Sequence, residues 1–156
     1  MKYFILIDNS IKHPPKKHYG NASICWAAFR NKLESIPIRM GLLYYATPEG
    51  PNISFYYGII SALQRENTFL SGPSDVYVMG DCDPVIMQLK GQLGVDTMRC
   101  YYNKVKDLQS FFERTCQCRF TYESLREDNP VYQQVDKASK AGKEFFNRFF
   151  EAGAAR

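Results

Sequence analysis

Two short apolar runs in this chain each lead into a polar segment that contains an acid, and this pattern limits the possible folds most. Lys2–Ile7 reads KYFILI and is followed by Asp8, while Asp75–Met79 reads DVYVM and is followed by Gly80 and Asp81. A nearly continuous apolar run of this length, bounded by polar or glycine residues, is typical of a strand buried inside a sheet. Each run therefore predicts a buried strand that delivers a carboxylate at its end.

Changes in the hydrophobic period predict the other elements. Ala22–Phe29 and Met40–Ala46 suit two strands that follow the first, so we expect three consecutive strands to form an antiparallel meander. Cys118–Ser124 predicts a fifth strand. Apolar residues at three- and four-residue steps predict helices over Ile53–Leu63, Thr97–Thr115 and Val131–Phe150, and Pro84 suits the first turn of a further helix that runs to about Leu89 or Lys90.

The resulting order, βββαβααβα, predicts an α/β fold with a five-stranded mixed sheet flanked by helices. We expect the strands from Asp75 and Cys118 to lie parallel to the first, joined by right-handed crossovers. We also expect Asp83 to cap the second helix and Gly142 to kink the last. With 156 residues and 45% apolar content, the chain is expected to form one domain, residues 1–156.

Composition argues against a membrane protein and against a disulfide or zinc framework. No segment approaches the roughly 18 apolar residues that a membrane helix needs, and the opening MKYFILIDNS lacks the pattern of a signal peptide. We therefore expect an intracellular protein, cytoplasmic or nuclear, with no membrane partner. The five cysteines show no C-x-x-C spacing and are expected to be buried, reduced thiols.

The residues around the two acids resemble the ribonuclease H family, especially the branch found in plant-type retroelements. Residues 7–10, IDNS, look like the I-D-G-S that ends the family's first strand. Residues 80–91, GDCDPVIMQLKG, are similar to the family's G-D-S motif and the helix V-I-x-Q-L-x-G that follows it. Residues 126–129, REDN, and 135–139, VDKAS, resemble the loop and the last helix, which carries the final acid; a shorter spacing puts Gln133 in that acid's place.

One family position departs from the pattern. The family's second acid is a Glu near the start of the first helix, and counting back from Leu63 places Phe55 there. Glu49 precedes this helix, and Glu66 lies beyond the expected turn. The resemblance therefore implies that this acid is replaced by Phe55.

The resemblance implies a nuclease that hydrolyses the RNA strand of RNA–DNA hybrids endonucleolytically and depends on a divalent metal. It implies Asp8, Asp81 and Asp136 as the catalytic acids and as ligands of one or two Mg²⁺ or Mn²⁺ ions. Without the usual Glu we expect a weakened activity. The alternative is a catalytically degenerate module that keeps the fold and binds nucleic acid or a protein partner without cleaving. The three retained acids favour the enzyme.

Basic residues near the acids are predicted to hold the nucleic-acid backbone. Lys12, Lys16 and Lys17 lie in one loop after the first acid, Lys90 ends the second predicted helix, and Arg126 precedes the last. Cations around a carboxylate pocket hold phosphates by charge without reading the base sequence. The formal net charge of +4 is compatible with this partner, an RNA–DNA hybrid or duplex.

Overall fold

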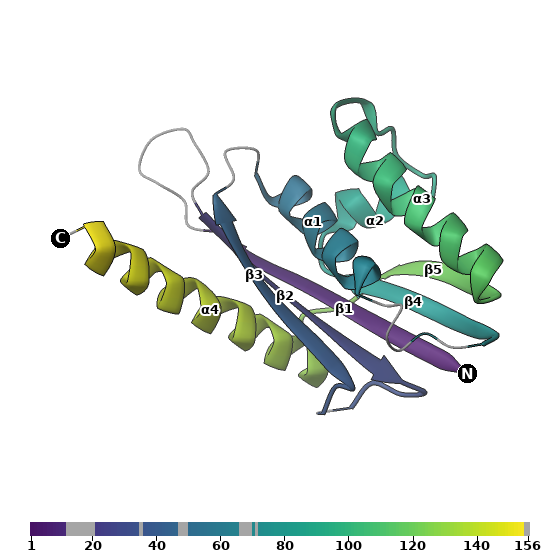
Figure 1. Ribbon diagram of the computed structural model, residues 1–156, viewed down its shortest axis with the longest axis horizontal. Coiled ribbons are helices and arrows are strands. Elements are labelled where there is room, and N and C mark those ends of the chain that lie inside the picture. The colour runs from purple at the N-terminus through teal and green to yellow at the C-terminus, as the bar shows by residue number, and fades with distance from the viewer. Residues whose placement is uncertain (12–20, 35, 47–49, 66–69, 71, 155–156) are drawn as a thin grey trace.

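A computed structural model describes residues 1–11, 21–34, 36–46, 50–65, 70 and 72–154. Five strands form one sheet, and helices cover both of its faces (Figure 1). The strands are β1 (Lys2–Ile11), β2 (Asn21–Arg30), β3 (Arg39–Ala46), β4 (Ser74–Gly80) and β5 (Cys118–Ser124). The helices are α1 (Pro51–Gln64), α2 (Asp83–Leu89), the 3-10 turn η2 (Asp96–Met98), α3 (Arg99–Thr115) and α4 (Pro130–Ala154).

The strand order across the sheet is β3-β2-β1-β4-β5. β1, β2 and β3 pair antiparallel as a meander, whereas β4 pairs parallel with both β1 and β5. The five-stranded mixed sheet and the order βββαβααβα expected from the sequence are therefore confirmed, with η2 as a short addition before α3.

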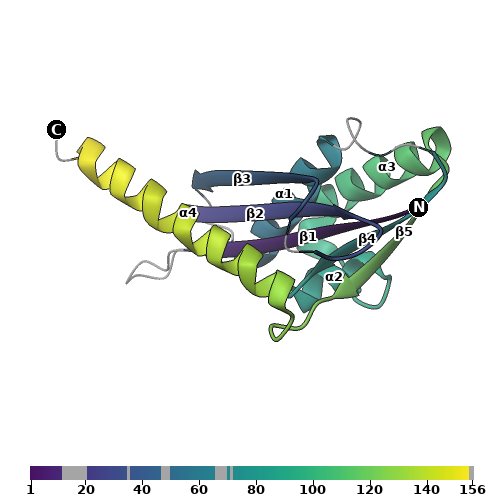
Figure 2. The ribbon, with the colours of Figure 1, turned by 90° about the horizontal axis from the view of Figure 1, so that it is seen from below.

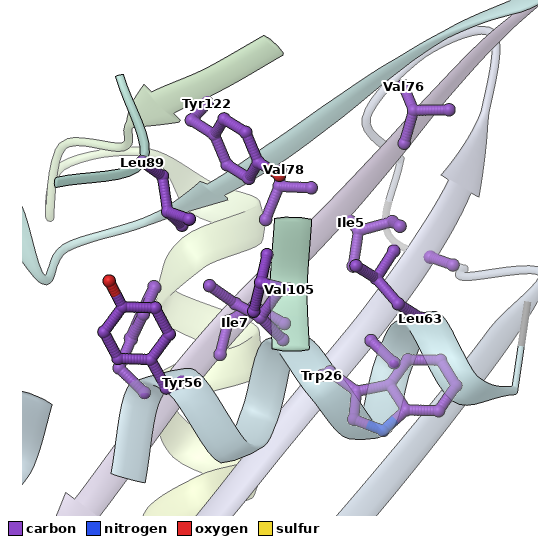
Figure 3. Packing of buried hydrophobic residues seen from close by; sticks show 14 of the residues in the cluster. Ile5, Ile7, Trp26, Tyr56, Leu63, Val76, Val78, Leu89, Val105 and Tyr122 are labelled. Carbon is purple, nitrogen blue, oxygen red and sulfur yellow. The ribbon is translucent and has the colours of Figure 1, made fainter. Parts of the chain in front are cut away.

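The two faces of the sheet carry separate cores. Ile5, Ile7 and Trp26 point to the face covered by α1, α2 and α3, where they are buried in the larger core (Figure 3). Leu6 points to the opposite face, which α4 covers (Figures 1 and 2). Because successive side chains of a strand point to opposite faces, Asp8 lies on the α4 side with Leu6.

β1 is longer than the apolar run KYFILI predicts. It continues to Ile11 because its pairing with β2 extends that far, whereas its pairing with β4 ends at the pair Ile7 and Gly80. Asp8 therefore lies within the strand, although it was expected at the strand's end. Since β4 has stopped at this level, the sheet is open on one side of Asp8.

The expectation that Asp83 caps the second helix is wrong. Asp83 is the first residue of α2 and not its cap, because its Oδ1 accepts a hydrogen bond from Ser124 Oγ at 2.7 Å and Cys82 takes the N-cap position. α4 passes through Gly142 as one continuous helix. The glycine instead allows close packing, since an added Cβ would lie 2.8 Å from Ser23 Oγ.

The cysteines agree only in part with the expectation. All five are free thiols, as predicted, but Cys100 is exposed while Cys25 and Cys118 are buried. None of the described helices combines the length and the apolar character needed to cross a membrane.

Candidate functional site

Asp8 and Asp81 meet where β4 ends. Asp81 directly follows β4, and the pairing of Ile7 with Gly80 places Asp8 of β1 beside the end of β4 from which Asp81 continues. The Tyr132 hydroxyl of α4 lies within hydrogen-bond distance of both acids, 2.7 Å from Asp81 Oδ2 and 3.2 Å from Asp8 Oδ1. Both carboxylates therefore lie within hydrogen-bond distance of one and the same atom.

The environment of Asp8 opposes its negative charge. Asp8 is only 1% exposed, and this burial raises the pKa of its carboxyl to about 7. The nearby acids Asp81 and Asp136 act in the same direction, while the hydroxyls of Ser139 and Tyr132 act against it. Within the part of the chain that the structure describes, Asp8 Oδ2 is buried without a hydrogen-bond partner. A cation next to this oxygen would favour the ionised carboxylate and would give Oδ2 a partner.

α4 brings the third predicted acid to the same place. Asp136 lines a pocket of about 300 Å³ together with Asp8 and Asp81. Its Oδ2 accepts a hydrogen bond from Lys140 Nζ at 2.8 Å, in an ion pair one helical turn apart. Gln133, the other candidate for the family's final acid, lines the same pocket and donates to the Glu127 carbonyl at 3.3 Å. Both residues therefore face the site.

The start of α4 fixes the position of Tyr132. Asn129 Oδ1 accepts hydrogen bonds from the backbone N–H groups of Val131 at 2.9 Å and Tyr132 at 3.3 Å, which is how an Asn caps a helix. The Tyr132 side chain is buried in the core cluster that includes Leu6 and Met79. Burial and the neighbouring carboxylates raise the pKa of the Tyr132 phenol, so it keeps its proton at neutral pH.

Phe55 packs against Gly80, the residue that precedes Asp81. Asn9 Nδ2 donates to the Pro51 carbonyl at 2.9 Å, so the start of α1 lies beside β1 next to Asp8. The Phe55 side chain is fully buried, and its ring packs so tightly on Gly80 that an added Cβ there would overlap it. The helix start thus presents a hydrophobic ring next to the residue that precedes Asp81.

A groove of about 750 Å³ runs from Asp81 between α2 and the loop that joins β5 to α4. Lys90 and Arg126, both predicted to hold nucleic acid, are exposed and line it. Carboxylates outnumber these two cations along the groove, namely Asp81, Asp83, Glu127 and Asp128. Lys12, Lys16, Lys17, Glu49 and Glu66 lie outside the described residues.

The residues present fit one hard cation better than two. Asp8 and Asp81 offer oxygens that converge, which is what Mg²⁺ or Mn²⁺ prefers. Among the residues that the structure describes, however, no three His, Cys, Asp or Glu side chains form a group that could hold a metal. Phe55 contributes no oxygen, and Asp136 is paired with Lys140.

The sequence analysis did not identify Tyr132 or Lys140 as site residues. The helical spacing contained the signal, since residues four apart share a helix face and Asp136 lies four residues from each of them. Tyr132 reads as one more apolar position in the pattern of this helix, and this hides its polar contact.

Comparisons with known proteins give matches among solved structures alone. No protein-family model matches the sequence, and no curated protein matches it. RNase H1 from the halophilic archaeon Halobacterium salinarum is 16% identical, with a TM-score of 0.68 over 92% of this chain and 98% of that one. The N-terminal RNase H domain of Rv2228c from Mycobacterium tuberculosis is 19% identical, with a TM-score of 0.66 over 92% and 96%. LC11-RNase H1 in complex with an RNA/DNA hybrid is 17% identical, with a TM-score of 0.63 over 87% and 98%.

Proposed function

Since this chain has the ribonuclease H fold, we propose that it is a nuclease of low activity that cleaves the RNA strand of RNA–DNA hybrids at Asp8 and Asp81. The observation that carries this proposal is the convergence of the two carboxylates on one point, with Asp8 Oδ2 buried and unpartnered among the described residues. These two acids would hold one Mg²⁺ or Mn²⁺ ion. When bound, such an ion polarises a phosphodiester and favours attack by water.

The groove supports nucleic acid as the substrate class. It is open to solvent at Asp81, and Lys90 and Arg126 can each contact a backbone phosphate along it. Because carboxylates outnumber cations there, phosphates are repelled unless a divalent cation accompanies them. One of the similar solved structures holds an RNA/DNA hybrid, which supports the hybrid as the form to test first.

The same site explains why the proposed cleavage of the RNA strand is slow. Two ions normally act on the two sides of a phosphodiester, and several carboxylates must converge to hold them. Phe55 adds none, and Lys140 neutralises Asp136. A single ion held by Asp8 and Asp81 leaves one side of the reaction without its electrostatic support.

A module that binds hybrid without cleaving it is the second candidate. The observation in its favour is the Tyr132 hydroxyl, which already lies within hydrogen-bond distance of one oxygen of each acid. In this case Lys90 and Arg126 hold the backbone while the acid pair stays closed.

Cleavage of a hybrid whose RNA strand is end-labelled tests the proposal. The purified chain is incubated with the hybrid over a range of Mg²⁺ and Mn²⁺ concentrations. We expect slow, metal-dependent cleavage that falls at least about tenfold in Asp81→Asn, because a neutral amide is a poor ligand for a hard cation. Asp96→Asn makes the same change at an exposed position in η2 and should leave the rate unchanged.

Phe55 separates the two candidates. Phe55→Glu adds a carboxylate beside Gly80, whereas Phe55→Gln adds a side chain of similar size without charge. A slow parent enzyme that is accelerated by Phe55→Glu and not by Phe55→Gln supports the nuclease. The non-cleaving module predicts a different outcome. In that case the parent binds hybrid but does not cleave it at any metal concentration, and only Phe55→Glu gives cleavage.

A further inference from the structure

Tyr132 occupies the point at which Asp8 and Asp81 converge. Its hydroxyl lies 2.7 Å from Asp81 Oδ2 and 3.2 Å from Asp8 Oδ1, at the end of β4. A hydroxyl has one hydrogen to donate. The shorter contact has the length of a charge-assisted bond to a carboxylate, so the bond to Asp81 is the stronger one.

The rest of the side chain holds the hydroxyl in place. Tyr132 is 5% exposed, and its ring packs with Leu6 and Met79 beneath α4. Its backbone N–H is bound by the Asn129 cap in the first turn of the helix. The hydroxyl can therefore leave the acid pair only if a buried ring or the start of α4 moves.

From this geometry we propose that Tyr132 competes with a divalent cation for Asp8 and Asp81, so that its hydroxyl keeps the acid pair closed when no cation is bound. This inference rests on the proposed function, since it requires the acid pair to bind a cation at all. An incoming cation must displace the hydroxyl from both carboxylates, and this displacement lowers its affinity. Tyr132 is thus a positioning residue that sets the metal concentration at which the site opens.

The contact of Lys140 with Asp136 follows the same principle. The ammonium group of Lys140 lies 2.8 Å from Asp136 Oδ2, so α4 supplies a counter-group to that acid as well. Lys140 is largely exposed and can move away freely, whereas the Tyr132 ring is fixed by packing. Tyr132 therefore lowers the affinity for the cation more than Lys140 does.

Direct binding of Mn²⁺, followed by electron paramagnetic resonance of the free ion, tests the proposal without any nucleic acid. The variants are Tyr132→Phe and, as a matched control, Tyr122→Phe, which removes a buried hydroxyl that donates to Gln109 at 2.7 Å, remote from the acids. We expect Tyr132→Phe to bind Mn²⁺ about tenfold more tightly than the parent, a factor typical of one hydrogen bond to a carboxylate. Tyr122→Phe should bind Mn²⁺ as the parent does.

Thermal unfolding supplies a second measurement. Without metal, Tyr132→Phe should melt below the parent, because Asp8 and Asp81 lose their donor. With Mn²⁺ the melting temperature should rise more than in the parent. Tyr132→Leu removes the ring together with the hydroxyl and serves as a second variant. It should show the same gain in Mn²⁺ affinity.

The outcomes separate this inference from the proposed function. Equal Mn²⁺ affinity in the parent, Tyr132→Phe and Tyr132→Leu, with weaker binding in Asp81→Asn, would overturn the role of Tyr132 and leave the cation site standing. No Mn²⁺ binding in any folded variant would overturn the cation site and the role of Tyr132 together.

Discussion

Asp8 carries a carboxylate where burial and two neighbouring acids oppose ionisation, so its titration is coupled to folding. Its pKa is raised from 3.8 to about 7 in the folded chain. Between these two values the folded chain holds a proton that the unfolded chain has released. Stability therefore falls as the pH rises through this window, and the contribution is fully present only below the lower value.

Replacement of Asp8 tests this coupling. In metal-free buffer, the free energy of unfolding of the parent should decrease between pH 4 and pH 7, and Asp8→Asn should lack most of this decrease. At pH 8 the variant should be more stable by on the order of 2 kcal/mol, since a pKa unit corresponds to about 1.4 kcal/mol and neighbours relax. Asp107→Asn, an exposed change on α3, should keep the parent's profile. Parallel profiles of Asp8→Asn and the parent in urea titrations would contradict the account.

Single residues show where prediction from the sequence succeeds and where it fails. Asp8 and Asp81 could be singled out because each follows an apolar run typical of a buried strand and stands in a motif that resembles the ribonuclease H family. The choice between Gln133 and Asp136 could not be made, because the two lie nearly one helical turn apart and both face the pocket. Tyr132 was missed because its hydroxyl contacts depend on residues more than 50 positions away.

At the level of elements, the cap of α4 couples helix stability to the site. Asn129→Ala removes the acceptor of two backbone N–H groups and should lower the free energy of unfolding by about 1 kcal/mol. Asn103→Ala, in the exposed interior of α3, should raise it slightly because Ala favours a helix. Urea denaturation measures both. Equal effects of the two substitutions would show that Asn129 does not act as a cap.

The limits of individual elements depend on distant partners. The sequence predicted the existence and the type of all five strands and of the four α-helices. It could not predict that β1 continues to Ile11, because this extension comes from pairing with β2. It placed Asp83 at a cap because the competing Ser124 belongs to β5, 41 residues later. Both errors concern contacts that hydrophobic periodicity does not contain.

For the whole molecule, the charge along the groove determines how nucleic acid is held. Replacing Lys90 and Arg126 together by Ala should weaken hybrid binding and flatten its salt dependence by about one logarithmic unit per lost phosphate contact. Lys2→Ala with Lys32→Ala removes the same charge at the start of β1 and just after the end of β2, and should leave the slope nearly unchanged. Fluorescence anisotropy over a range of salt concentrations measures both slopes. Identical slopes in the two double variants would show that Lys90 and Arg126 do not contact the phosphates of the bound hybrid.

The proposed nuclease requires that Asp8 and Asp81 together bind a divalent cation. Anomalous diffraction from crystals of the parent chain soaked in Mn²⁺ at millimolar concentration tests it most directly, because it locates the ion without relying on activity. We expect one anomalous peak between the two carboxylates, with the Tyr132 hydroxyl displaced from them. The absence of a peak at this position, with the hydroxyl still bound to both acids, would contradict this expectation.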